Sequence, residues 1–183
     1  KKIEEGTFRG CTSLESVTIP KGVKKINGRA FYGCTSLKSI TIPESVTEIR
    51  GCAFSDCTSL KSVVIPKGVE VINHYAFNSC ISLKNVTIPE SVTYIGSDAF
   101  SGCVSLKSII IPKSVSEIQG FAFERCPSLE SIVVAEGNPV YDSRNQCNAI
   151  IKTESNTLIA GCLSTIIPNS VTSIGDFLFE RWS

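Results

Sequence analysis

Residues 34–56 read CTSLKSITIPESVTEIRGCAFSD, and this pattern recurs along the chain with a step of 23 residues. Four residue types keep that step over most of the sequence: a cysteine, a leucine three positions after it, a phenylalanine and a proline. The cysteine positions are Cys11, Cys34, Cys57, Cys80, Cys103 and Cys126. A unit of this length is too short to enclose a core, so it must stack on its neighbours. The repeat therefore predicts a solenoid.

Each unit contains a segment with the alternation that is typical of a β-strand. In residues 37–42 apolar and polar side chains alternate, so Ser39 and Thr41 should face outward while the isoleucines face the core. Pro43 has no N–H to donate and should end this strand. Residues 46–49 predict a second short strand on another wall, followed by a tight turn or a short 3₁₀ piece. We therefore expect a right-handed stack of parallel strands without long helices.

The period breaks once, toward the C-terminal end. Pro112 and Pro168 occupy equivalent positions but lie 56 residues apart, ten more than two periods. The inserted segment covers about residues 138–162. Within it, residues 149–151 and 158–160 are apolar and flank a polar turn. This arrangement predicts a β-hairpin that projects from the solenoid wall.

We expect residues 1–183 to form a single solenoid that is a fragment of a longer array. The chain opens in the middle of a unit, and neither end carries the polar capping unit that solenoids need for solubility. Regular repetition resumes after the insertion, and Trp182 falls at the cysteine position of the last unit.

Composition and motifs argue against several classes of function. Lys and Arg total 18 and Asp and Glu total 17, so nothing favours a nucleic-acid partner. No apolar run approaches the ~20 residues of a spanning helix, so we expect no membrane insertion in this segment. The one histidine, His74, has no partner at a metal-binding or catalytic spacing, and there is no CxxC pair. We therefore expect no enzyme activity, no metal and no cofactor.

The unit IPxSVTxIxxxAFxxCxSLxSIxIP closely resembles the BspA-like, Treponema-type leucine-rich repeat. Residues 88–106 are a near-complete example, and residues 137–160 resemble the insertion that recurs in these arrays. The resemblance implies a β-rich leucine-rich-repeat solenoid and a bacterial protein that is secreted or displayed on the cell surface. It also implies adhesion, with an extracellular or host protein or polysaccharide as the partner. The family offers no shared catalytic or binding residue to carry over. A structural spacer that presents another domain is the alternative function.

The cysteines divide into two groups. Those that follow the period are expected to be buried small apolar residues, one per coil. Cys52 occupies a variable position and should be partly exposed. Cys147 and Cys162 lie in the insertion, and they face each other across the hairpin if its turn is centred between Glu154 and Ser155. The sequence leaves open whether these two form a disulfide or remain two buried thiols.

The positions that vary within the fixed frame form the candidate binding surface. The outward strand positions carry small side chains that become more apolar toward the C-terminus, and a lysine occupies the position beside them in four consecutive units. This lysine row is either a basic stripe for an acidic partner or a device for solubility and edge protection. The insertion is the competing contact point. The candidate partner-binding residues are Lys38, Ser39, Thr41, Lys61, Ser62, Val64, Lys84, Asn85, Thr87, Lys107, Ser108 and Ile110.

Overall fold

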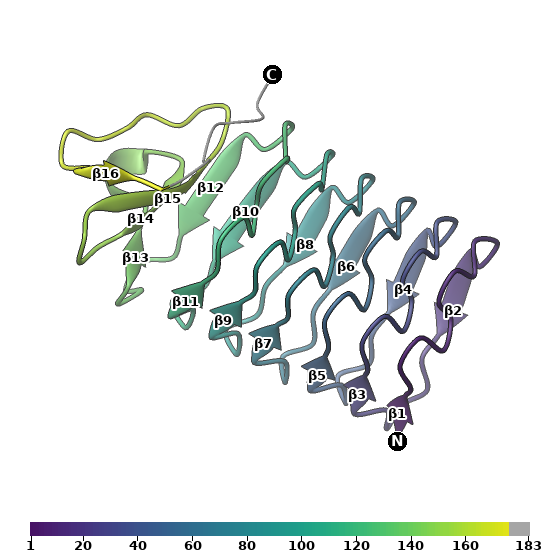
Figure 1. Ribbon diagram of the computed structural model, residues 1–183. Helices are drawn as coiled ribbons and strands as arrows, with labels where there is room; N and C mark the ends of the chain where they lie inside the picture. Colours follow the sequence, from purple (N-terminus) through teal and green to yellow (C-terminus); the bar gives the residue numbers. More distant parts are fainter. Residues whose placement is uncertain (176–183) are drawn as a thin grey trace.

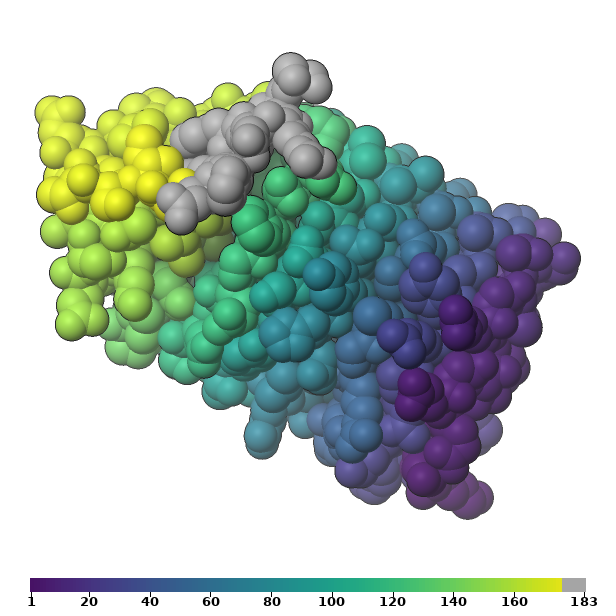
Figure 2. All heavy atoms as spheres, viewed as in Figure 1, coloured from purple at the N-terminus to yellow at the C-terminus, as the bar shows by residue number. Residues whose placement is uncertain are grey.

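The chain winds into a stack of coils, and the computed structural model describes residues 1–175 of it (Figure 1). Trp182, which the repeat places at a cysteine position, lies outside the described residues. Successive coils form continuous layers from the N-terminal end to the C-terminal end (Figure 2). Each regular coil contributes a short strand, a run of turns and a longer strand, so the stack has two sides made of strands and a third made of turns.

The longer strands form one side of the stack, which we call the long-strand wall. They are the alternating segments that the sequence predicts. Neighbouring strands pair in parallel, and each residue lies opposite the one 23 positions away, as Ser39 lies opposite Ser16. Main-chain bonds at the lysine position continue the ladder between pairs, since the N–H of Lys61 donates to the carbonyl of Lys38 at 3.3 Å. The strands are β2 (Ser16–Thr18), β4 (Ser39–Thr41), β6 (Ser62–Val64), β8 (Asn85–Thr87), β10 (Ser108–Ile111) and β12 (Ser131–Val134).

The short strands form a second side, a six-stranded parallel sheet that we call the short-strand wall. Its isoleucines pair with one another from coil to coil, as Ile26 does with Ile49 and Ile49 with Ile72. The strands are β1 (Lys2–Ile3), β3 (Lys25–Ile26), β5 (Glu48–Ile49), β7 (Val71–Ile72), β9 (Tyr94–Ile95) and β11 (Glu117–Ile118). The two walls confirm a parallel solenoid built from 23-residue repeats.

Residues 28–34 and their equivalents form the third side, which we call the turn side. Its turns are also bonded from coil to coil, because the N–H of Phe31 donates to the carbonyl of Ala53 at 2.8 Å. Within a coil, the N–H of Cys34 donates to the carbonyl of Phe31 at 3.1 Å and closes the turn. The one helix among residues 1–175 is the short 3₁₀ segment η1 (Arg144–Gln146). The expectation of turns in place of long helices is therefore confirmed.

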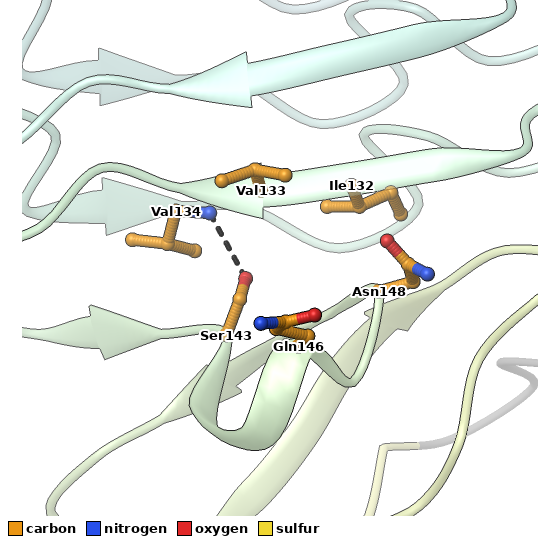
Figure 3. A pocket seen from close by; sticks show the side chains of 6 residues that line it. All are labelled: Ile132, Val133, Val134, Ser143, Gln146 and Asn148. Carbon is orange, nitrogen blue, oxygen red and sulfur yellow. Dashed lines mark hydrogen bonds between the residues drawn. The ribbon is translucent and has the colours of Figure 1, made fainter.

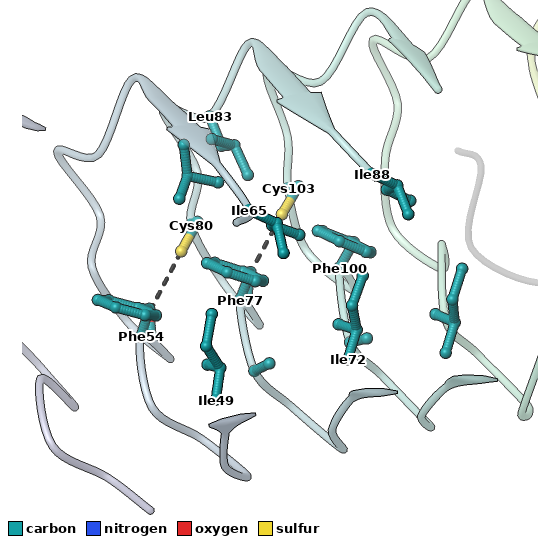
Figure 4. Close-up of a cluster of buried hydrophobic side chains, with 14 of the residues drawn as sticks. Ile49, Phe54, Ile65, Ile72, Phe77, Cys80, Leu83, Ile88, Phe100 and Cys103 are labelled. Carbon is teal, nitrogen blue, oxygen red and sulfur yellow. Dashed lines mark hydrogen bonds between the residues drawn. The ribbon is translucent and has the colours of Figure 1, made fainter. Parts of the chain in front are cut away.

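Stacked side-chain columns fill the space between the three sides (Figure 4). Leu37, Leu60 and Leu83 have no exposed surface. The phenylalanine rings lie face to face from Phe8 to Phe123, with neighbouring ring centroids 5.0 to 5.7 Å apart. Equivalent residues of successive coils therefore share one column, because the coils stack at the spacing of paired strands, about 4.8 Å.

Five of the six repeat cysteines, Cys34 to Cys126, are buried beside the phenylalanines as expected, whereas Cys11 in the first coil is exposed and the expectation is wrong for it. The buried ones also form hydrogen bonds that the sequence did not reveal. The thiol of Cys57 donates to the carbonyl of Phe31 at 3.2 Å, and that carbonyl also accepts the N–H of Cys34. Figure 4 shows the same bond from Cys80 to Phe54 and from Cys103 to Phe77. Burial raises the pKa of Cys34 to about 11 and that of Cys57 to about 12.

The insertion forms a four-stranded sheet at the C-terminal end of the stack (Figure 1). The predicted hairpin is present, but the prediction that it projects from the wall is wrong. Ile150 and Ala160 are buried in the main core, whereas Ile151 and Leu158 are buried in a second cluster. Both faces of the hairpin are apolar, and each is covered by one of these two clusters. The hairpin therefore packs against the end of the stack. The strands are β13 (Tyr141–Asp142), β14 (Ala149–Lys152), β15 (Thr157–Gly161) and β16 (Ser173–Ile174).

The two cysteines of the insertion are buried free thiols in the structure, and the choice between a disulfide and two thiols is left to thiol counting. Near the turn the register is the expected one, with Lys152 opposite Thr157. A bulge between Ile150 and Ile151 then shifts the pairing by one residue, which takes Cys147 and Cys162 out of direct opposition. Cys147 belongs to the second cluster and Cys162 to the main core, so the two side chains point into different apolar environments.

The phenylalanine column should dominate stability. Phe77→Ala removes a fully buried ring that stacks on both neighbours, and we expect a loss of about 3–5 kcal/mol in the free energy of unfolding, measured by urea denaturation. Phe121→Ala is the matched control, because that ring is 44% exposed and outside the column. A loss below ~1 kcal/mol for Phe77→Ala would contradict the role of the column.

Thiol reactivity should separate exposed from buried cysteines. In the native protein at pH 8 we expect rapid labelling of Cys11, which is exposed, and of Cys52, which is partly exposed. The buried repeat thiols should react only on unfolding, because burial keeps them protonated. Titration in denaturant without reductant should find all nine thiols, as all nine are free. A count of seven would mean that a disulfide forms after all.

Candidate functional site

The outward face of the long-strand wall is a regular array of small side chains. Its hydroxyl and carboxamide groups make no side-chain hydrogen bond to any other residue of the described chain, so they face solvent. Val64 and Ile110 are 63% and 62% exposed. The candidate residues of the wall lie as the alternation predicts, with Ser39, Thr41, Ser62, Asn85, Thr87 and Ser108 also exposed. The β-branched members have few accessible rotamers, so this face is ordered before any partner arrives.

The lysine row divides into paired and unpaired members. Lys38 forms an ion pair with Glu15 at 2.9 Å, and Lys107 forms one with Glu130 at 2.7 Å. Lys61 and Lys84 lie between these two lysines in the row, and neither has an ion-pair partner in the part of the chain that the structure describes. Their main chains are bonded directly, because the N–H of Lys84 donates to the carbonyl of Lys61 at 2.9 Å. The row is therefore a central pair of uncompensated positive charges with neutralised ends.

A hollow of about 380 Å³ lies where the long-strand wall meets the insertion (Figure 3). The hydroxyl of Ser143 accepts the N–H of Val134 at 2.9 Å and donates to the carbonyl of Ala149 at 2.7 Å, which holds the loop against β12. The hollow is lined by Ile132, Val133, Val134, Ser143, Gln146 and Asn148. The sequence predicts a contact point at the insertion as a whole but not these residues, because their meeting depends on the tertiary packing.

The polar residues that could suggest chemistry have structural roles. Asp142 accepts hydrogen bonds from Arg144 at 2.6 and 2.8 Å, which holds the pKa of that carboxyl below its usual range. Nδ1 of His74 accepts the N–H of Ser97 at 3.0 Å, and Nε2 faces the hydroxyl of Tyr94 at 3.3 Å. Within residues 1–175 no three His, Cys, Asp or Glu side chains gather as a metal site would require. That part of the chain also has no helix with the length and apolar character to cross a membrane.

The two strand walls, the turn side and the leucine and phenylalanine columns define a leucine-rich-repeat solenoid with almost no helix. Residues 1–130 match the model of the BspA type leucine rich repeat region in six copies. The chain therefore belongs to the BspA-type leucine-rich-repeat family. A comparison with curated proteins finds no match.

Several solved structures are similar to this chain. The T. pallidum leucine rich repeat protein is 40% identical with a TM-score of 0.62, over 64% of this chain and 57% of that one. A leucine rich cell surface protein from Faecalibacterium prausnitzii is 32% identical with a TM-score of 0.69, over 87% and 49%. The pneumococcal vaccine antigen PcpA, at 24% identity, shares the fold with a TM-score of 0.75, over 90% and 42%. The chain spans about half the length of these proteins.

Proposed function

We propose that this chain is a non-catalytic binding segment of a cell-surface or secreted adhesin. The observation that carries the proposal is the rigid, outward face of the long-strand wall, which presents unengaged polar groups beside the uncompensated charges of Lys61 and Lys84. Membership of a repeat family is consistent with a scaffold, and the similar F. prausnitzii protein is described as a cell surface protein.

The chemistry of this wall favours an anionic partner. Two lysines without carboxylate partners attract carboxylate or sulfate groups, and the neighbouring hydroxyls can donate to them. The face is broad and lacks a deep cavity, which suits a host or extracellular protein or a polysaccharide better than a small metabolite. Little ordering entropy is lost on binding, because the coil-to-coil hydrogen bonds already hold the face in place.

Replacing the two central lysines tests this assignment. We expect Lys61→Glu with Lys84→Glu to weaken binding to immobilised heparin and to an oligoglutamate peptide by about tenfold or more, and to reduce the salt dependence of what remains. The matched control is Lys21→Glu with Lys113→Glu, which makes the same charge change at exposed proline turns. Thermal melting should be unchanged in both, because exposed charges contribute little to stability.

The competing contact point is the hollow beside the insertion. Deleting the hairpin would uncover the core, so the sharper variants are Val133→Arg and Gln146→Arg, which fill the hollow from exposed positions. Binding of all variants is measured on a panel of immobilised matrix proteins. If the lysine double variant binds fully and the arginine variants do not, the binding site is the insertion and not the long-strand wall. If the parent binds no better than a variant with a scrambled outward face, the chain is a structural spacer.

A further inference from the structure

The turn side holds one residue of each coil in the left-handed backbone region. In the first coil this residue is Gly6, at a φ of 63°, and glycine is the residue that this conformation favours. The next five coils use side chains that it disfavours, with φ from 55° to 64°. These residues are Arg29, Cys52, Tyr75, Asp98 and Phe121.

A second left-handed position, four residues further along each coil, provides an internal comparison. It carries glycine in three coils, at Gly10, Gly33 and Gly102, and Asp56, Ser79 and Arg125 in the other three. Glycine therefore meets the same backbone demand in three coils at this position and in one coil at the other, where two of the occupants are aromatic. Large side chains that are held in a strained backbone conformation indicate that these residues serve a function other than stabilising the fold.

The middle of this row presents two aromatic rings on either side of a carboxylate. Tyr75 and Phe121 are each 44% exposed, and Asp98 occupies the equivalent position in the coil between them. The main chain is fixed, because the N–H of Tyr75 donates to the carbonyl of Ser97 at 3.0 Å and that of Asp98 to Gly120 at 3.3 Å. With coils about 4.8 Å apart, a group seated above Asp98 is within reach of both rings.

The Asp98 carboxylate accepts hydrogen bonds from Tyr75 and Ser101, and the nearby charge of Arg125 also favours its ionised form. Burial raises the pKa of the Asp98 carboxyl, and the neighbouring Asp98 carboxylate raises the pKa of the Tyr75 phenol. No cation of the described chain lies within ion-pair distance of Asp98, and the nearest ion-pair partner of Arg125 is Glu124, at 3.9 Å. A partly buried carboxylate beside exposed aromatic rings is suited to a cation, which gains both an opposite charge and cation–π contacts.

We propose that Tyr75, Asp98 and Phe121 form a second docking site, which takes a lysine or arginine side chain of a partner protein. Tyrosine and arginine are the residues that dominate protein–protein contacts, whereas serine, threonine and valine are under-represented there. The turn side carries Arg29, Tyr75 and Phe121, while the long-strand wall carries mostly serine, threonine and valine. The two faces therefore differ in chemistry, and the sign of charge that each attracts is opposite.

Glycine at the strained position separates binding from folding. Tyr75→Gly deletes the aromatic anchor and replaces it with the residue that the backbone prefers, so the melting temperature should hold or rise. Asp98→Asn removes the charge with a residue that tolerates the left-handed region. We expect each change to weaken binding of an oligolysine peptide by about tenfold. Ser79→Gly, at the second left-handed position, and Glu90→Gln, an exposed charge elsewhere, should leave binding within about twofold.

Parental affinity in both Tyr75→Gly and Asp98→Asn would overturn the proposal. So would an equal loss in the two controls, since that would mark the binding as non-specific attraction, and so would the absence of oligolysine binding by the parent. Oligoglutamate measured in parallel reports on Lys61 and Lys84, so failure at one face leaves the result at the other intact.

Discussion

Hydrogen bonds from each coil to the next are the interaction on which this protein depends. They occur on all three sides: Lys38 N–H to Glu15 O at 3.0 Å, Asn27 N–H to Ile3 O at 3.1 Å, and Phe31 N–H to Ala53 O at 2.8 Å. A coil of 23 residues cannot satisfy its own main chain or bury its own apolar side chains. Stacking solves both problems at once, and it forces equivalent residues into columns.

The columns explain why the repeat uses these residue types. A cysteine is small and apolar enough to pack beside a phenylalanine ring, and its thiol still donates to the carbonyl of the preceding coil. An alanine there would leave that second acceptor site of the carbonyl unused. The inward positions are therefore constrained twice, by packing and by hydrogen bonding. The outward positions of the long-strand wall have neither constraint, which leaves their side chains free to differ between coils and so to carry recognition.

The strands, the two walls and the inward columns could be predicted, because a strict period with alternating apolar residues encodes them directly. The hairpin was predictable from its apolar segments, but the bulge at Ile150 and the burial of both hairpin faces depend on contacts with the rest of the fold. The pairing of Lys38 and Lys107, which leaves Lys61 and Lys84 free, depends on side-chain geometry. The left-handed positions were hidden, because only Gly6 signals the demand that Tyr75 and Phe121 also meet.

The insertion sheet has a consequence for the fidelity of assembly. Near-identical coils can stack with one coil skipped and still form most of their ladders, so a repetitive chain is open to misalignment by whole units. The sheet of β13 to β16 docks on the coil that precedes it through main-chain groups that every regular coil repeats. The hydroxyl of Tyr141 accepts the N–H of Ile118 at 3.0 Å, and Asn138 donates to the carbonyls of Pro112 and Val115 at 2.9 and 2.8 Å. These bonds would form equally well on a slipped stack, so the irregular unit ends the series of coils without counting them, and the side chains that differ between coils must distinguish the correct stack.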